Sequence, residues 1–246
     1  MMADFKFPSE TVELPSKGLV YPKDNPLSSG KIEIKYMTAK EEDILTNQAY
    51  IQNGTVLDKL LESVVVSKVN TNDLVIGDKN AVLVATRILG YGKDYTFSYL
   101  GEEYKIDLTT LKNKEFDVSL VEEGKNEFKY KLPHTGTDIT FKILNGNDEK
   151  KIQKELEGLK KINKNSSPEL STRLKYIITS VGEEKESKAI REFVDNFLLA
   201  RDSRALREYI NQNQPDIDLT YTLDDGEEVK VPIGLTFFWP DYGDSI

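Results

Sequence analysis

The amino-acid sequence predicts an α+β protein with two helical layers, a small antiparallel β insert between them, and a C-terminal β-hairpin that leads into an aromatic tail. Helical apolar periodicity recurs in two separate stretches, and the periodicity changes to strict alternation between residues 95 and 144 and again after residue 219. Gly-Glu-Glu-Val-Lys-Val at residues 226–231 also repeats Gly-Glu-Glu-Tyr-Lys-Ile at residues 101–106. We therefore expect two copies of one β-hairpin element.

The composition is that of a globular protein with a charged surface. The 246 residues are 38% hydrophobic and 30% charged, enough for one large domain or two small ones. The formal net charge of -9 argues against a nucleic-acid binder, which needs a basic face. Five lysines follow one expected helix, and we interpret them as a solvated helix face: Lys150, Lys151, Lys160, Lys161 and Lys164.

Cysteine is absent from the sequence, which excludes disulfides, thiol catalysis and thiolate metal sites. The N-terminus has no apolar run of signal-peptide length. The longest apolar stretch, residues 81–90, is interrupted by Arg87 and is shorter than the ~20 residues of a membrane span. We expect synthesis in a cytoplasm and no membrane partner.

Residues 1–92 are expected to form an extended proline-rich arm, a short strand and helices. Four prolines up to Pro26 favour an extended chain with turns. Thr38 and Glu41 have the spacing of a capping box, and Asp78 has the position of an N-cap. The expected elements are a strand at residues 31–36 and helices at residues 39–47, 56–67 and 79–89.

Residues 93–145 are expected to form the β insert. Alternation predicts a hairpin over residues 95–108 and a second one over residues 128–143, which turns at Pro133 to Gly136. Phe116 and Val118 suggest another short strand between the two hairpins.

Residues 146–213 are expected to form a second helical unit, and residues 214–246 the terminal hairpin and tail. Apolar stripes predict helices at residues 148–164, 168–181, 187–200 and 203–211. Ser167 and Ser203 are the expected N-caps of the second and fourth of these helices, with Pro168 at the first helical position.

No catalytic constellation stands out, and we assign no catalytic, cofactor-binding or metal-binding residue. The only histidine, His134, lies in a turn, which excludes multi-histidine metal sites. A hydrolase that uses Asp216, Asp218 and Asp224 is the alternative, although Asp-Asp-Gly at residues 224–226 has a simpler role in turn formation. We expect no small-molecule substrate.

Single-stranded nucleic acid could in principle stack on aromatic side chains of the first hairpin. This would require Tyr95, Phe97 and Tyr99 to be exposed beside lysines. The acidic charge balance makes this the least favoured alternative.

The two ends of the chain carry the candidate contact residues. Phe237, Phe238 and Trp239 either fill the chain's own core or anchor a partner, because large aromatic side chains concentrate binding energy at interfaces. The extended N-terminal arm is the other candidate segment. The partner-binding hypothesis comprises Leu14, Leu19, Tyr21, Phe237, Phe238 and Trp239.

Several phrases, in order along nearly the whole chain, carry a family resemblance. They are Leu-Pro-Ser-Lys-Gly at residues 14–18 with Tyr-Pro at 21–22, Tyr-Met-Thr-Ala-Lys-Glu-Glu-Asp-Ile-Leu at 36–45, Gly-Asp-Lys-Asn at 77–80, Asp-Ser-Arg-Ala-Leu-Arg at 202–207 and Phe-Phe-Trp-Pro at 237–240. Together they resemble the baseplate hub and hub-assembly proteins of T-even-type contractile-tailed bacteriophages.

The resemblance implies a non-enzymatic protein that binds other phage baseplate or tail proteins. It implies either a component of the hub or a tail-assembly chaperone that is absent from the finished particle. The implied locations are the host bacterial cytoplasm during assembly and the tail baseplate of the virion. Some relatives carry Cys-x-x-Cys pairs in the two hairpin regions, as in zinc ribbons; this chain has none, which puts a metal role in doubt.

Overall fold

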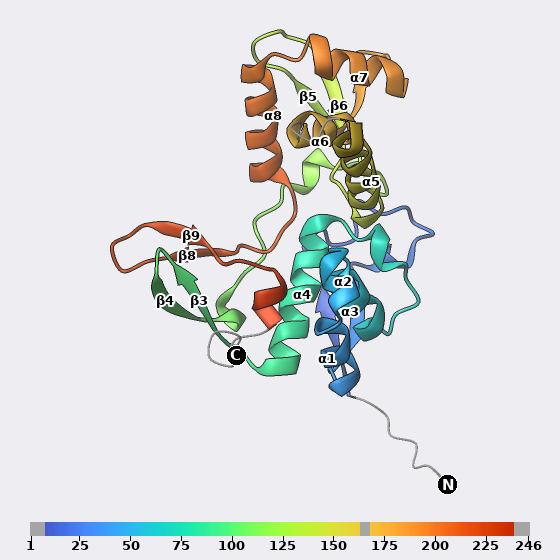
Figure 1. Ribbon diagram of the computed structural model, residues 1–246. Helices are drawn as coiled ribbons and strands as arrows, with labels where there is room; N and C mark the ends of the chain where they lie inside the picture. The colour runs from blue at the N-terminus through green and yellow to red at the C-terminus, as the bar shows by residue number, and fades with distance from the viewer. Residues whose placement is uncertain (1–7, 163–167, 239–246) are drawn as a thin grey trace.

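The structure is a computed structural model that describes residues 8–162 and 168–238. Figure 1 shows a lower helical layer, an upper region of helices around a small sheet, and two β-hairpins that lie side by side to the left of the lower layer. All sheets among the described residues are small and antiparallel. The predicted α+β fold class is therefore confirmed.

The lower layer combines one two-stranded sheet with four helices. Strand β1 (Ser9–Glu13) pairs with β2 (Lys31–Lys35), so part of the expected arm is a strand. The helices are α1 (Ala39–Leu45), α2 (Gln48–Gln52), α3 (Val56–Val64) and α4 (Ile76–Tyr91). Helix α2, whose first turn is capped by the side chain of Asn47, is not among the elements that the sequence patterns predict.

Helix α4 begins at Ile76, so Asp78 lies inside the first turn and is not the N-cap. Its carboxylate is buried and accepts hydrogen bonds from the N-terminal arm instead of from its own helix. Next to it, a Cβ on Gly77 would lie 1.9 Å from the carbonyl oxygen of Pro215. Only glycine therefore lets the segment before the C-terminal hairpin cross α4 at this distance.

The capping box of α1 forms as predicted around Glu41. The Glu41 carboxylate accepts from the backbone N–H of Thr38 at 2.8 Å, from Ser63 Oγ at 2.6 Å and from Lys35 Nζ at 2.8 Å. Burial alone would raise the pKa of Glu41, but these hydrogen bonds outweigh it and lower the pKa from 4.5 to about 2. One carboxylate thus ties α1 to β2 and α3.

Replacement of Glu41 by glutamine is expected to lower the free energy of unfolding at neutral pH by about 2 kcal/mol. Because the folded state holds this carboxyl at the lower pKa, its contribution is complete above the unfolded pKa of 4.5 and is lost as the pH falls toward about 2. Urea denaturation over this range should show the wild type and the variant converging. Asp43→Asn, an exposed change in the same helix, is the control. A difference between wild type and variant that stays constant with pH would contradict the assignment.

The expected β insert is divided between two sheets. Strand β3 (Asp94–Tyr99) pairs with β4 (Glu102–Asp107) as predicted, and β8 (Thr220–Thr222) with β9 (Glu228–Lys230). The prediction of a strand at Phe116 and Val118 is wrong, since residues 118–120 form a 3-10 turn and Phe116 is buried in the core. The second hairpin of the insert belongs to the upper region.

The upper region is a three-stranded sheet with helices. Strand β6 (Asp138–Phe141) lies between β5 (Phe128–Lys131) and β7 (Ile178–Val181). The helices are α5 (Gly146–Ile162), α6 (Glu169–Ile177), α7 (Ser187–Asn196) and α8 (Ala200–Asn213). Ser203 is inside α8, whose N-cap is Leu199, so its predicted capping role is wrong; Ser167 lies outside the described residues.

The predicted helix at residues 168–181 ends early, at Ile177. Residues 178–181 instead form β7, which pairs with the free edge of β6 and buries Ile178 and Ser180 on one face. Pro168 occupies the N-cap position, before the first helical residue Glu169. A short apolar run satisfies both helical and strand periodicity, and here pairing with β6 decides the outcome.

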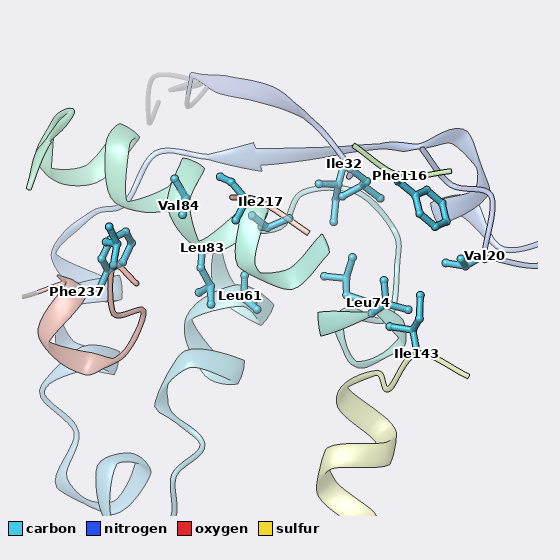
Figure 2. Packing of buried hydrophobic residues seen from close by; sticks show 14 of the residues in the cluster. Val20, Ile32, Leu61, Leu74, Leu83, Val84, Phe116, Ile143, Ile217 and Phe237 are labelled. Atoms are coloured by element: carbon cyan, nitrogen blue, oxygen red, sulfur yellow. The ribbon is translucent and has the colours of Figure 1, made fainter. Parts of the chain in front are cut away.

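The core joins distant parts of the chain. Figure 2 shows Leu83 of α4 near Leu61, with Ile217 and Phe237 from the C-terminal segment close to the same helix. Residues 216–218 run beside residues 112–114 through two backbone hydrogen bonds of 2.8 and 2.7 Å. No described helix combines the length and the apolar character that a membrane span requires.

Candidate protein-binding surface

The N-terminal candidates Leu14 and Tyr21 are buried, so the expectation that they contact a partner is corrected. Tyr21 OH donates to Asp78 Oδ2 at 2.6 Å and accepts from the backbone N–H of Val75 at 3.0 Å. Burial, together with the nearby Asp78 carboxylate, raises the pKa of the Tyr21 hydroxyl well above its ordinary value. The arm is therefore fastened to α4; Leu19, by contrast, is half-buried.

The aromatic tail fills the core as far as it is described. Phe237 and Phe238 are both 0% exposed, and the Phe237 ring meets Tyr95 edge to face at 4.8 Å. Arg87 Nε donates to the carbonyl oxygen of Phe237 at 2.9 Å. Of the two interpretations of the tail, the core interpretation holds for these two phenylalanines, and their assignment as partner anchors is corrected. Trp239 lies outside the described residues.

The candidate carboxylates are not brought together in one closed cavity. Asp216 accepts from Asn80 Nδ2 at 3.1 Å beside α4, whereas Asp224 is exposed in the turn between β8 and β9. A hydrogen bond from Thr220 lowers the pKa of Asp218. General acid–base catalysis needs a pKa near the working pH, so this environment disfavours such a role for Asp218.

An open groove of about 350 Å³ lies between β4 and the start of β8. It includes Asp107 and Asp218 but neither Asp216 nor Asp224, and lysines line it as well. The hydrogen bond from Lys93 lowers the pKa of Asp107 to about 2. Within the described residues, no group of histidine, aspartate and glutamate side chains has an arrangement suited to a metal ion.

His134 has a structural environment. Its backbone N–H and that of Thr135 donate to the buried carboxylate of Asp202 at 2.8 and 3.1 Å. Burial alone would raise the pKa of Asp202, but these donors hold it below its ordinary value. Asp202 thus fixes the turn between β5 and β6 against α8.

The two similar hairpins pack on each other and form one unit, which we call the hairpin arm: residues 94–107 and 219–231. The ring of Phe97 meets that of Tyr221 edge to face at 5.6 Å, and Tyr99 OH donates to Glu227 at 2.8 Å. Phe97 is buried, and so is Tyr95, whose ring packs against Phe237. The exposure that nucleic-acid stacking would require is therefore not met.

The outer end of the hairpin arm is acidic and carries one exposed aliphatic side chain. Six exposed carboxylates make up what we call the acidic tip: Glu102, Glu103, Asp224, Asp225, Glu227 and Glu228. Leu100 at the turn between β3 and β4 is 85% exposed and has a φ of 49°. That φ costs a leucine about 1 kcal/mol and suits asparagine or glycine, so both backbone conformation and hydration disfavour this residue here.

The acidic tip and Leu100 are not among the candidate contact residues that the sequence predicts. The repeated Gly-Glu-Glu phrase was the available signal, because it places acidic residues at corresponding positions of both hairpins. Comparison with models of protein families, with curated proteins and with solved structures gave no match for this chain.

Proposed function

We propose that this chain is a non-enzymatic protein of a bacteriophage tail, either a baseplate hub component or a hub-assembly factor, that acts through protein–protein contacts. The observation that carries the proposal is the position of the resembling phrases in the fold. Each phrase contributes a buried or helix-capping group that connects separate segments of the chain. Ser16 and Tyr21 of the first phrase bind Asp78 of the third. Residues at such positions stabilise the fold, and this role requires no catalytic site.

The remaining phrases follow the same rule. Glu41 links α1 to β2 and α3, and Asp202 holds the turn that contains His134. The carbonyl oxygen of Phe237 accepts from Arg87, whose guanidinium also donates to the carbonyl oxygens of Gly92 and Asp94. We infer that the family resemblance concerns the fold, and that binding is left to surfaces outside these phrases.

The hairpin arm is the surface that we assign to partner contact. Its outer end projects from the rest of the molecule in Figure 1 and carries both the acidic tip and Leu100. An aliphatic side chain surrounded by charges has the pattern of an interface with an apolar centre and a polar rim. The host cytoplasm during assembly and the tail baseplate are the proposed locations.

Affinity purification of the tagged full-length protein from phage-infected cells tests the proposal. We expect baseplate or tail proteins to be recovered with the wild type, and less of them with a variant that changes Leu100 to asparagine and Asp224 to lysine. The matched control carries Leu170→Asn and Asp43→Lys. Leu170 is a 48% exposed leucine on α6, and Asp43 is also exposed. Recovery of no tail protein would overturn the proposal. Mass spectrometry of purified particles then separates a hub component, which is present, from an assembly chaperone, which is absent.

A further inference from the structure

The lysines of α5 form a basic face that is complementary to the acidic tip. Five exposed lysines make up what we call the lysine face: Lys150, Lys151, Lys154, Lys160 and Lys161. Spacings of four and seven residues place Lys150, Lys154 and Lys161 along one side of the helix, with Glu157 among them. Among the described residues, the only ion pair of these lysines is between Lys150 and Asp58, at 3.9 Å.

The lysines keep this positive character because other elements neutralise the acids of α5. Arg173 pairs with Glu149 at 2.7 Å, Arg191 with Glu155 at 2.6 Å, and Lys142 with Asp148 at 2.7 Å. Conversely, none of the six acidic-tip carboxylates has an ion pair with a described cation. The acidic tip is therefore uniformly negative, and the lysine face has five lysines against one exposed glutamate, Glu157.

Each patch also contains an aliphatic side chain that water surrounds. Ile162 at the end of α5 is 86% exposed, and Leu100 beside the acidic tip is 85% exposed. These are the two highest values among the exposed large hydrophobic residues of the described chain. Contact between them would remove apolar surface from water beside charges of opposite sign.

We propose that copies of this chain associate head to tail, with the acidic tip and Leu100 of one copy docked on the lysine face and Ile162 of the next. Figure 1 shows the hairpin arm at the left of the molecule and α5 to the right of its centre, so the two surfaces lie apart within one chain. An interface between two different surfaces of identical chains repeats, and it generates a ring or a filament. The proposal does not depend on the phage assignment.

Sedimentation velocity of the full-length protein at low and high salt tests whether copies associate. Exposed charge pairs are weakened by salt, so the mass at about 0.05 M salt is expected to rise with protein concentration and to fall toward that of one chain at about 0.5 M. A protein that stays monomeric at both salt concentrations across the concentration range would overturn the proposal.

Charge reversal identifies the two surfaces. One variant reverses the tip with Glu103→Lys, Asp224→Lys and Glu228→Lys; the other reverses the face with Lys154→Glu, Lys160→Glu and Lys161→Glu. Each alone is expected to lose association at least tenfold, and an equimolar mixture is expected to regain it, because each variant then offers the surface that the other lacks. Failure of the mixture to associate would overturn the proposed pairing.

The control for net charge is Asp24→Lys with Asp43→Lys and Glu192→Lys. These exposed positions lie outside both patches, and the change from -9 by +6 to -3 equals that of the tip variant. The control is expected to associate at least as well as the wild type, because only the general repulsion between copies is reduced. A loss equal to that of the tip variant would contradict the assignment to the acidic tip.

Leu100→Asn separates a binding role of Leu100 from a structural one. Asparagine tolerates the positive φ of this turn position and is the residue that such two-residue turns favour. The variant is expected to have a higher urea midpoint than the wild type and a severalfold weaker association. A higher midpoint with unchanged association would show that Leu100 has no part in the contact and would overturn its place in the proposal.

Discussion

Replacement of Phe237 by alanine is expected to lower the free energy of unfolding by about 4 kcal/mol. The ring is fully buried between Tyr95, at 4.8 Å, and Phe238, at 5.5 Å, so its removal leaves a cavity where the C-terminal segment meets α4 and β3. Urea denaturation followed by circular dichroism measures this loss. Truncation after Gly234 removes both phenylalanines and the carbonyl group that Arg87 binds, and an unfolded product is expected.

The control for this prediction is Phe197→Ala. Phe197 is 62% exposed between α7 and α8, so the same change in chemistry is expected to alter stability by no more than about 0.5 kcal/mol. A truncated protein that remains folded would contradict the core assignment of the tail and would return Phe237 and Phe238 to the list of candidate partner anchors.

Replacement of Asp78 by alanine is expected to destabilise the protein by about 3 to 5 kcal/mol. Three buried donors would lose their acceptor: the backbone N–H of Ser16 at 2.8 Å, Ser16 Oγ at 2.6 Å and Tyr21 OH at 2.6 Å. Ser16 Oγ already accepts from Gly18 and Tyr21 OH from Val75, so both hydroxyl hydrogens point to the Asp78 carboxylate. The first turn of α4 would lose three hydrogen bonds to the N-terminal arm and keep the one from Val75 to Tyr21.

Urea denaturation measures the change in stability, and limited proteolysis locates it. Cleavage is expected to appear first within residues 14–22 of the variant, because the arm loses its attachment to α4. Asp43→Ala, an exposed change in α1, is the control and is expected to be near neutral. In a double-mutant cycle, Tyr21→Phe is expected to cost less in the Asp78→Ala background than in the wild type, since the two groups share a hydrogen bond. Strictly additive losses would contradict the proposed network.

The sequence by itself determined the elements whose stabilising contacts are local. The capping box of Thr38 and Glu41 spans four residues, and each Gly-Glu-Glu hairpin has a turn glycine, Gly101 or Gly226, that accepts a positive φ. Helical periodicity likewise located α3, α5 and α7 within a few residues of their observed bounds. These features depend on residues that are close in the chain, so the pattern of the sequence is enough to predict them.

The candidate surface could not be predicted from the sequence, because it depends on how these elements are arranged in space. The repeat predicted two hairpins, but only the contact of Phe97 with Tyr221 shows that they form one arm whose carboxylates gather at one end. Four lysines of the predicted solvated helix face are exposed on α5, namely Lys150, Lys151, Lys160 and Lys161, and the fifth, Lys164, lies outside the described residues. Arg173 from α6 and Arg191 from α7 neutralise two acidic residues of α5, and this leaves the positive charge of the lysines unbalanced.

Tertiary structure alone decided the positions whose partners are distant in sequence. Asp78 has the sequence position expected of an N-cap. Its carboxylate instead accepts hydrogen bonds from Ser16 and Tyr21, which are 62 and 57 residues away. Residues 178–181 continue a helical pattern, but the unpaired edge of β6 makes them a strand. Phe237 and Phe238 could have been core or interface, and the contacts of Phe237 with Arg87 and Tyr95 join residues more than a hundred positions apart. In each case the deciding energy is a hydrogen bond or an apolar contact that exists only after the chain has brought remote segments together.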